Sequence, residues 1–281
     1  MKSINKLQVG IIAGAVILFV LLYFANKKPV KKAEDVMVNA SESIKKVDLK
    51  VFIDAKIASL NDSLRMRFNY LNKQLVNSTT SNTAPLDSII KFLDDDLKLP
   101  DITSVYVEKK ANLLKTGTAW NYAGKRYFTA VRFVKDPAEG QALYQAAINC
   151  YTKGLQLEPN DVEAKINLAA CYVDGTTDPM KGIAMLKEIE KTDSANVSLQ
   201  LTFALFSAKS QQWPKAISRY EKVIKLKPDF LDAYLYMADA YEKSGNTLKT
   251  IETLEKFASL CPDKAMSGEI NKYIEKLKTN H

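Results

Sequence analysis

The chain has 281 residues, of which 47% are apolar and 26% are charged, so its composition excludes a wholly disordered protein. Its only histidine is His281, the last residue, which removes most chemistry built on imidazole: Ser-His-Asp triads, Cys-His pairs and HExxH zinc sites. The net charge of +8 could suggest nucleic-acid binding, but residues 1–50 hold nine lysines against four acids, so most of the excess lies in the first fifth of the chain.

That basic region surrounds a strongly apolar segment. Residues 7–26 contain no charged residue, and lysines flank them on both sides, where they would meet lipid phosphates: Lys2, Lys6, Lys27, Lys28, Lys31 and Lys32. An α-helix of about 20 residues crosses a hydrocarbon core of about 30 Å. A cleaved signal peptide is the alternative, but its apolar region is usually only about 7–15 residues long. We therefore predict that residues 1–26 form an uncleaved, single-pass transmembrane anchor.

The side of the membrane is less well determined by the sequence. Four lysines after the span against two before it weakly favour a cytoplasmic C-terminal domain. A short tail before a single span is instead typical of a bacterial signal anchor that exports the domain after it. We expect the periplasmic side of a bacterial inner membrane, and the cytoplasmic side is the alternative.

Between the anchor and the next domain, residues 27–45 are predicted to form a charged juxtamembrane linker, and residues 46–116 a helical region. Apolar residues then recur with a period of 3.6, which indicates a straight amphipathic helix rather than a coiled coil: Ile57, Leu60, Leu64, Phe68, Leu71 and Leu75. We expect this helix, within 46–75, to pack on the next domain, where it could occupy a groove; self-association is the alternative.

The rest of the helical region is divided by turn-forming residues. Asn77–Pro85 is predicted to be a loop, followed by two shorter helices near 86–98 and 102–115. The acidic run Asp94–Asp96 is interpreted as a solvated helix end, because it lacks the alternating ligands and the glycine of an EF-hand calcium loop.

The remaining sequence repeats itself. Pro228 and Pro262 lie 34 residues apart, each closing an amphipathic stretch, and Ala204 falls in register with Ala238. Each unit of this length holds two helical patterns separated by a short polar turn. Such a period is typical of a helical repeat protein, with the small residues where the two helices of a pair approach closely.

These residues resemble the tetratricopeptide repeat (TPR), whose pattern is W-x2-L-G-x2-Y…A-x3-F…P. Trp120, Gly124 and Tyr127 match the first helix, and Ala147 and Tyr151 match the second, with 11 additional residues between the two parts. We interpret the insertion as lengthening both helices by about a turn and a half each. Helix starts are predicted by an aspartate as N-cap followed by a proline, at Asp136-Pro137 and Asp178-Pro179.

The resemblance implies a chain of stacked helix pairs. The predicted TPR domain, 117–264, divides into repeats at 117–161, 162–196, 197–230 and 231–264, and residues 265–281 hold a C-terminal capping helix. Because one pair cannot bury its apolar face alone, neighbours stack into a solenoid and its ends need caps. The expected fold class is all-α: a transmembrane helix, a helical segment, and a TPR α-solenoid of about four repeats with a capping helix.

No motif in the sequence indicates catalysis, and we predict no catalytic, cofactor-binding or metal-binding residue and no enzyme activity. The chain has no P-loop, no GxGxxG and no CxxC. Cys150, Cys171 and Cys261 are interpreted as small, mostly buried apolar residues, and a Cys150–Cys171 bridge in an exported domain is the alternative.

In TPR proteins the first helix of each pair lines a groove, chiefly through repeat positions 2, 5, 9, 12 and 13. Carried over, these positions predict an apolar groove with an acidic C-terminal rim: Ile166, Ala170, Val173, Leu201, Leu205, Ala208, Leu235, Asp239 and Glu242. Asn121 and Lys125 hold the carboxylate-clamp positions in reverse order, which argues against that subfamily's function. The alternative is that the chain itself covers these residues.

The sequence therefore predicts a membrane-tethered scaffold that binds a protein or peptide in this groove. A holdase-type chaperone or assembly factor for translocated envelope proteins is the alternative function. We expect no nucleic-acid partner, because no aromatic-interleaved basic stripe follows the anchor.

Overall fold

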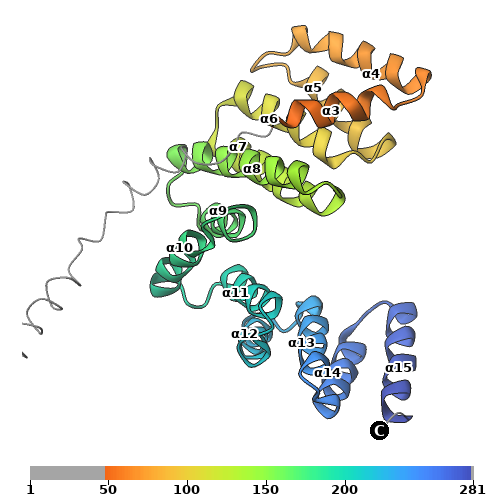
Figure 1. Ribbon diagram of the computed structural model, residues 1–281, viewed down its shortest axis with the longest axis vertical. Coiled ribbons are helices and arrows are strands. Elements are labelled where there is room, and N and C mark those ends of the chain that lie inside the picture. Colours follow the sequence, from red (N-terminus) through yellow and green to blue (C-terminus); the bar gives the residue numbers. More distant parts are fainter. Residues whose placement is uncertain (1–47, 280–281) are drawn as a thin grey trace, which may run out of the picture. The chain divides into compact units, whose positions relative to one another are not determined.

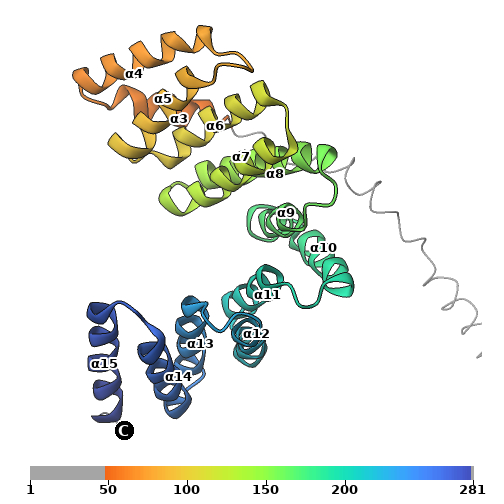
Figure 2. The ribbon, with the colours of Figure 1, turned by 180° about the vertical axis from the view of Figure 1, so that it is seen from behind.

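The computed structural model describes residues 48–279, which form thirteen α-helices and no strand. The predicted anchor at residues 1–26 and the linker at 27–45 lie outside these residues. Within 48–279, no helix is both long and apolar enough to cross a bilayer. The helices stack in chain order from α3–α6 to α13–α15 (Figures 1 and 2), with these bounds: α3 Leu49–Ala58, α4 Asp62–Gln74, α5 Ala84–Lys91, α6 Pro100–Leu114, α7 Gly117–Ala130, α8 Pro137–Leu157, α9 Val162–Gly175, α10 Pro179–Thr192, α11 Val197–Lys209, α12 Trp213–Leu226, α13 Leu231–Lys243, α14 Thr247–Leu260 and α15 Lys264–Thr279.

Helices α3–α6 share one apolar core. Phe68 of α4 and Tyr106 of α6 meet edge to face, with ring centroids 6.1 Å apart. The buried members of this cluster come from α4–α6 and the short π-helical segment Phe92–Asp96: Phe68, Leu86, Ile89, Phe92, Leu93, Ile102 and Tyr106. Two apolar residues of α3, Ile53 and Ile57, pack against them. The segment 48–75 therefore uses its apolar face within this bundle.

The prediction of one straight helix through residues 57–75 is wrong, because the chain breaks between α3 and α4. The Ser59 hydroxyl donates to the Lys56 carbonyl at 2.7 Å, so a carbonyl group in the last turn of α3 has a hydrogen-bond partner. The Asn61 side chain accepts from the Leu64 amide at 2.9 Å and caps α4. The 3.6-residue period continues across the break, so the period alone did not reveal it, whereas the N-capping residue Asn61 could have.

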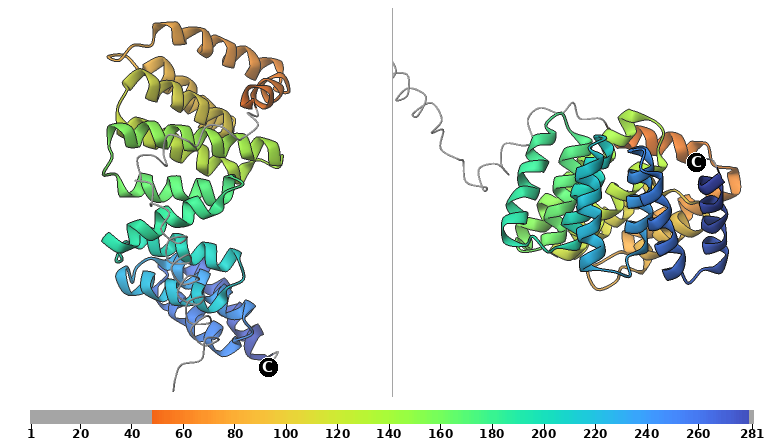
Figure 3. Two further views of the ribbon diagram at one scale, coloured as in Figure 1. Left: turned by 60° about the vertical axis from the view of Figure 1, so that its left-hand side comes forward. Right: turned by 90° about the horizontal axis from the view of Figure 1, so that it is seen from below.

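The region after α6 consists of helix pairs. Each pair packs as an antiparallel hairpin: α7 with α8, α9 with α10, α11 with α12, and α13 with α14; Figure 3 shows these hairpins as successive layers. The predicted helix starts are confirmed: the side chains of Asp136 and Asp178 accept from backbone amides in the first turns of α8 and α10. The helix α15 packs on α14, and its Ile274 is buried.

The predicted lengthening of both helices in the first repeat is wrong for α7. This helix has 14 residues, like α9, whereas α8 has 21 residues and α10 has 14. The remaining inserted residues form the 3₁₀ turn Val131–Phe133 and the approach to Asp136. A new helix begins at Pro137 with Asp136 as its N-cap, so the extra residues lie in α8 and in the turn before it.

Large buried tyrosines fill the spaces beside small residues in these hairpins. Tyr127 and Tyr151 are each 1% exposed, and Gly124 lies against the Tyr151 ring. The Tyr127 hydroxyl donates to the Glu108 carboxylate at 2.6 Å, which joins α7 to α6. The α-solenoid and the preceding bundle are therefore continuous in packing through α6 and α7.

Candidate functional site

The predicted groove residues do not all lie at the surface. Ile166 and Ala170 of α9 are only 1% and 5% exposed, and Ile166 belongs to a core cluster with Leu186 and Leu199. The chain itself therefore covers these two residues, which is a correction to their assignment as partner-binding residues. Their repeat positions predicted the groove, but Ala170 is buried and Ile166 packs with residues of α10 and α11 instead.

Leu235 of α13 is also occupied by intramolecular packing. It contacts a cluster formed by Ala238, Leu254 and Ile274, the last from α15. The Glu242 carboxylate on the same helix accepts from the Tyr273 hydroxyl of α15 at 2.5 Å. The C-terminal helix therefore takes up part of the predicted acidic rim, whereas Asp239 stays half exposed and pairs with Lys243 at 2.8 Å.

The apolar surface that remains is on α11. We define the α11 patch as Leu201, Leu205 and Ala208: Leu205 is 38% exposed, and Leu201 and Ala208 are partly buried against the α11–α13 core. Val173 of α9 is also partly buried. Beside these residues Lys209 of α11 binds Asp174 of α9 at 2.6 Å. The α11 patch is a small apolar surface next to charged groups, which suits an apolar anchor of a partner.

The structure also shows a cleft that the sequence did not indicate. It has a volume of about 630 Å³ and lies between α10, α11 and α12, with Phe203, Phe206 and Ile183 among its apolar lining and four basic residues: Lys187, Lys215, Arg219 and Lys222. None of these residues occupies a groove position of the repeat. We call this site the α10–α12 cleft.

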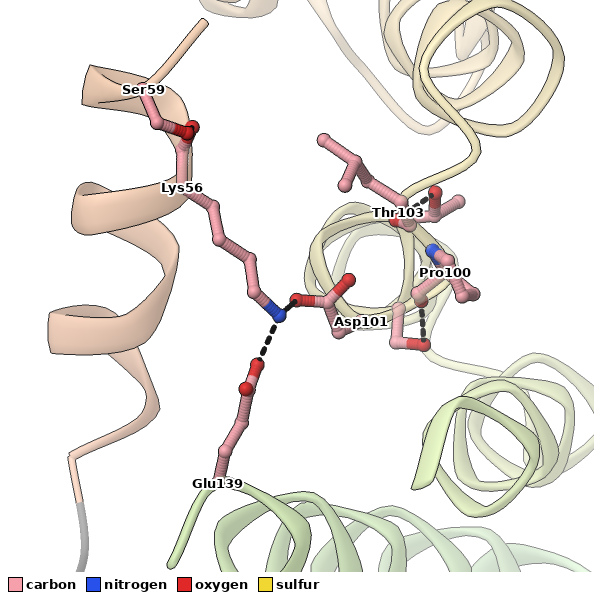
Figure 4. Close-up of polar contacts among 8 residues, drawn as sticks. Lys56, Ser59, Pro100, Asp101, Thr103 and Glu139 are labelled. Atoms are coloured by element: carbon pink, nitrogen blue, oxygen red, sulfur yellow. Dashed lines mark hydrogen bonds and ion pairs between the residues drawn. The ribbon is translucent and has the colours of Figure 1, made fainter. Parts of the chain in front are cut away.

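A cluster of charged side chains, which the sequence did not indicate either, joins three helices (Figure 4). The Lys56 ammonium of α3 binds the Asp101 carboxylate of α6 and the Glu139 carboxylate of α8, each at 2.6 Å. Both acids lie in the first turn of their helices, where the helix dipole favours a negative charge. Although burial opposes it, hydrogen bonding to both carboxylates raises the pKa of Lys56. Lys56 therefore stays charged and acts as a structural tie rather than as a base or nucleophile.

The cysteines have the environment of inert side chains. Cys150 and Cys171 are free and fully buried, as predicted, and burial raises the pKa of both thiols. A thiol that stays protonated is a poor nucleophile and a poor metal ligand. Within residues 48–279 no three His, Cys, Asp or Glu side chains gather closely enough to hold a metal ion. The Asp94 and Asp96 carboxylates instead pair with Arg126 and Arg67.

Comparison with known families identifies the repeats. Residues 208–245 match the family model described as TPR repeat, and residues 232–264 match the one described as tetratricopeptide repeat. These residues run from the end of α11 to α15. No curated protein sequence is significantly similar to the chain.

One solved structure supports the same fold, and two others are reported beside it. A tetratricopeptide repeat protein from Parabacteroides merdae is 15% identical, with a TM-score of 0.52 over 82% of this chain and 84% of that one. YrrB, described as a TPR protein with an unusual peptide-binding site, is 17% identical, with a TM-score of 0.40 over 72% of this chain and 97% of its own. MamA from Desulfovibrio magneticus RS-1, from residue 41 onward, is 15% identical, with a TM-score of 0.42 over 72% of this chain and 97% of that one. Residues 208–264 thus carry tetratricopeptide repeats, and the described helices form an all-helical, TPR-like solenoid.

Proposed function

We propose that this protein is a membrane-tethered, non-catalytic TPR scaffold that binds a protein or peptide partner through the α11 patch. The observation that carries the proposal is Leu205, a leucine 38% exposed at a groove position of the repeat, with Leu201 and Ala208 beside it. Fully burying an exposed leucine contributes about 1.5–3 kcal/mol, and covering the exposed 38% of Leu205 on binding contributes a corresponding part of that. The α11 patch is small, so it fits one apolar anchor of a partner segment rather than a broad hydrophobic interface.

Charged groups around the α11 patch would orient such a segment. Asp174 and Lys209 pair on one side, and Asp239 and Lys243 pair on the next repeat. The Asp174 side chain is only 18% exposed, whereas the Lys209 side chain is 69% exposed and can also meet a partner. Charges at the rim of an interface contribute more to orientation and association rate than to affinity.

Photo-crosslinking tests this assignment. With a photoreactive residue at position 205, we expect a distinct adduct with a partner in membranes. Position 260 is a matched control, because Leu260 is 40% exposed at the end of α14. The variant Leu205→Asp, probed from position 208, should lose the adduct because a charge would be buried against the partner's apolar anchor. Equal labelling from 205 and 260, or an adduct unchanged by Leu205→Asp, would refute the α11 patch. Many unrelated adducts from 205 alone would instead favour the holdase alternative.

The tether belongs to the same proposal and is supported by the sequence of residues 7–26, which lie outside the described part of the chain. We propose that these residues hold the protein in the membrane with the repeats on the periplasmic side. Confinement to a surface would raise the effective concentration of the scaffold toward other membrane proteins.

Thiol labelling in intact cells tests the side. In a Cys261→Ser background, Lys276→Cys places a thiol on an exposed position of α15, whereas Cys150 and Cys171 are fully buried. A reagent that crosses only the outer membrane should label Lys276→Cys and leave the parent unlabelled. Labelling that requires lysis would place the repeats on the cytoplasmic side, and release of the protein by alkaline carbonate would contradict the anchor.

A further inference from the structure

The α10–α12 cleft exists because one junction between repeats is packed less closely than the others. The second helix of each hairpin packs well on the helix that follows it for α8 on α9, α12 on α13 and α14 on α15, but α10 packs only sparsely on α11. In Figures 1 and 2 the chain turns sharply at this connection. Solenoids derive much of their stability from burying such junctions. This junction therefore leaves apolar surface within reach of a ligand.

The floor of the α10–α12 cleft is apolar and aromatic. Phe203 and Phe206 project from α11, and Ile183 comes from α10; all three are only partly buried. The two phenylalanines also touch the core cluster around Leu186 and Leu199, so their positions are set by the fold. A floor held in this way can receive an apolar side chain without rearrangement.

The rim of the α10–α12 cleft is positively charged. The exposed lysines are Lys187 of α10 and Lys215 and Lys222 of α12, and no acidic residue is among the described residues that line the cleft. Arg219 lies 4.5 Å from the centre of the Phe203 ring and binds Gln200 Oε1 at 2.7 Å. Thus the arginine is held in place while the lysines face solvent.

One carboxylate, that of Glu190, compensates part of this charge. It binds Arg219, whose hydrogen bond lowers the pKa of the Glu190 carboxyl, so it is ionised at neutral pH. Glu190 thereby neutralises Arg219. Glu190 also interacts with the charge of Lys222, so it reduces the positive charge of the three-lysine rim without cancelling it, and the rim still attracts an anionic ligand.

The α10–α12 cleft is separate from the α11 patch. Successive residues of an α-helix are rotated by about 100°, so Phe203, Phe206 and Ser210 lie on the face opposite Leu201 and Leu205. The cleft opens between the second helices of two neighbouring repeats. One partner segment lying on the α11 patch would therefore leave it accessible.

We propose that the α10–α12 cleft binds an acidic peptide segment of another protein, with an aromatic or long aliphatic side chain on the apolar floor at Phe206 and Ile183 and carboxylates on the lysine rim. Charge complementarity identifies the acidic partner, and the apolar floor identifies its anchor. A nucleic acid fits less well, because the Arg219 guanidinium already covers the Phe203 ring on which a base would stack.

A fluorescein-labelled peptide of about twelve residues, with glutamates around a Phe-x-x-Leu pair, is the probe. Its binding to the full-length chain in an uncharged detergent is measured by anisotropy. The variant Lys187→Glu/Lys222→Glu should weaken binding by about tenfold or more and reduce its salt dependence. The matched control Lys256→Glu/Lys276→Glu makes the same charge change at exposed lysines of α14 and α15 and should change the affinity by less than about twofold. Replacing the peptide's Phe and Leu by Ser should also abolish binding.

The position of the peptide decides the remaining outcomes. A benzophenone in place of its phenylalanine should crosslink to α10, α11 or α12 at the cleft. Crosslinks at Leu205, equal weakening in the control variant, or no binding of the probe would overturn the proposal. Three other results would also overturn it. The first is tighter, Lys187-dependent binding of a single-stranded oligonucleotide, and the second is binding of the peptide only after residues 33–45 are deleted. The third is a chain-to-chain crosslink that is lost in Lys187→Glu/Lys222→Glu. These last three results would assign the cleft to a nucleic acid, to the chain's own linker or to a second copy.

Discussion

Replacing Lys56 with methionine is expected to lower the free energy of unfolding by about 3 kcal/mol, because it leaves two buried carboxylates without their cation. The side chains of Asp101 and Glu139 are only 3% and 5% exposed, whereas that of Lys56 is 33% exposed. Urea denaturation followed by circular dichroism measures the change.

Two further variants separate this effect from a general loss of helix α3. Lys50 of the same helix pairs with Asp54, but their side chains are 74% and 57% exposed, so Lys50→Met should change stability little. Adding Asp101→Asn and Glu139→Gln to Lys56→Met should restore most of the loss, because no buried charge then remains unpaired. Equal destabilisation by Lys50→Met, or no recovery in the triple variant, would contradict the ion cluster as the cause.

The effect of Lys56→Met should also depend on pH. Burial raises the pKa of Glu139 above its ordinary value of 4.5, and Lys56 opposes this shift. A carboxyl whose pKa is raised by folding contributes stability below its ordinary pKa and loses that contribution as the pH rises through its native pKa. Without Lys56 the native pKa rises further, so the difference between variant and wild type should shrink from about pH 7 toward about pH 4.5. A difference independent of pH would argue that lost packing alone destabilises the variant.

Replacing Gly182 with alanine is expected to cost about 3 kcal/mol, because it forces apart the α9–α10 hairpin. A Cβ at Gly182 would overlap the carbonyl oxygen of Ala169 and lie 3.0 Å from the amide nitrogen of Val173. Both are backbone atoms of α9 and cannot rotate away. Thermal and urea unfolding measure the loss.

Gly268 of α15 is the matched control for this substitution. It also lies within a helix, but a Cβ there would meet nothing within 4 Å. Because alanine is a better helix former, Gly268→Ala should stabilise the protein by about 0.5–1 kcal/mol. A similar loss in both variants would show that close backbone approach is not what makes Gly182 sensitive.

Local sequence patterns predicted most of the helices. The proline spacing and the small residues near each hairpin predicted the repeats, and Asp136 and Asp178 predicted helix starts that the structure places at Pro137 and Pro179. These features depend on residues a few positions apart, so they can be recognised in the sequence without knowledge of the tertiary structure. The break before Asn61 is also local, but the apolar period is the same on both sides of it and therefore does not indicate it.

The candidate site depended more on tertiary packing. A repeat position says which way a side chain points, but the neighbouring helix decides whether it is covered. Ile166 is buried by α10 and α11, Leu235 packs in the cluster that includes α15, and Leu205 stays exposed. The same argument applies to the α10–α12 cleft, which arises from sparse packing between two helices rather than from a motif.

The sequence by itself determined that this chain is built from stacked helix pairs, where most of the helices begin, and that its positive charge is concentrated around residues 7–26. Only the tertiary structure decided which apolar residues face solvent and that Lys56 ties together Asp101 and Glu139, 45 and 83 residues away. The reason is physical: hydrogen bonding and helix periodicity act over a few residues, whereas burial and ion pairing depend on which distant helices meet.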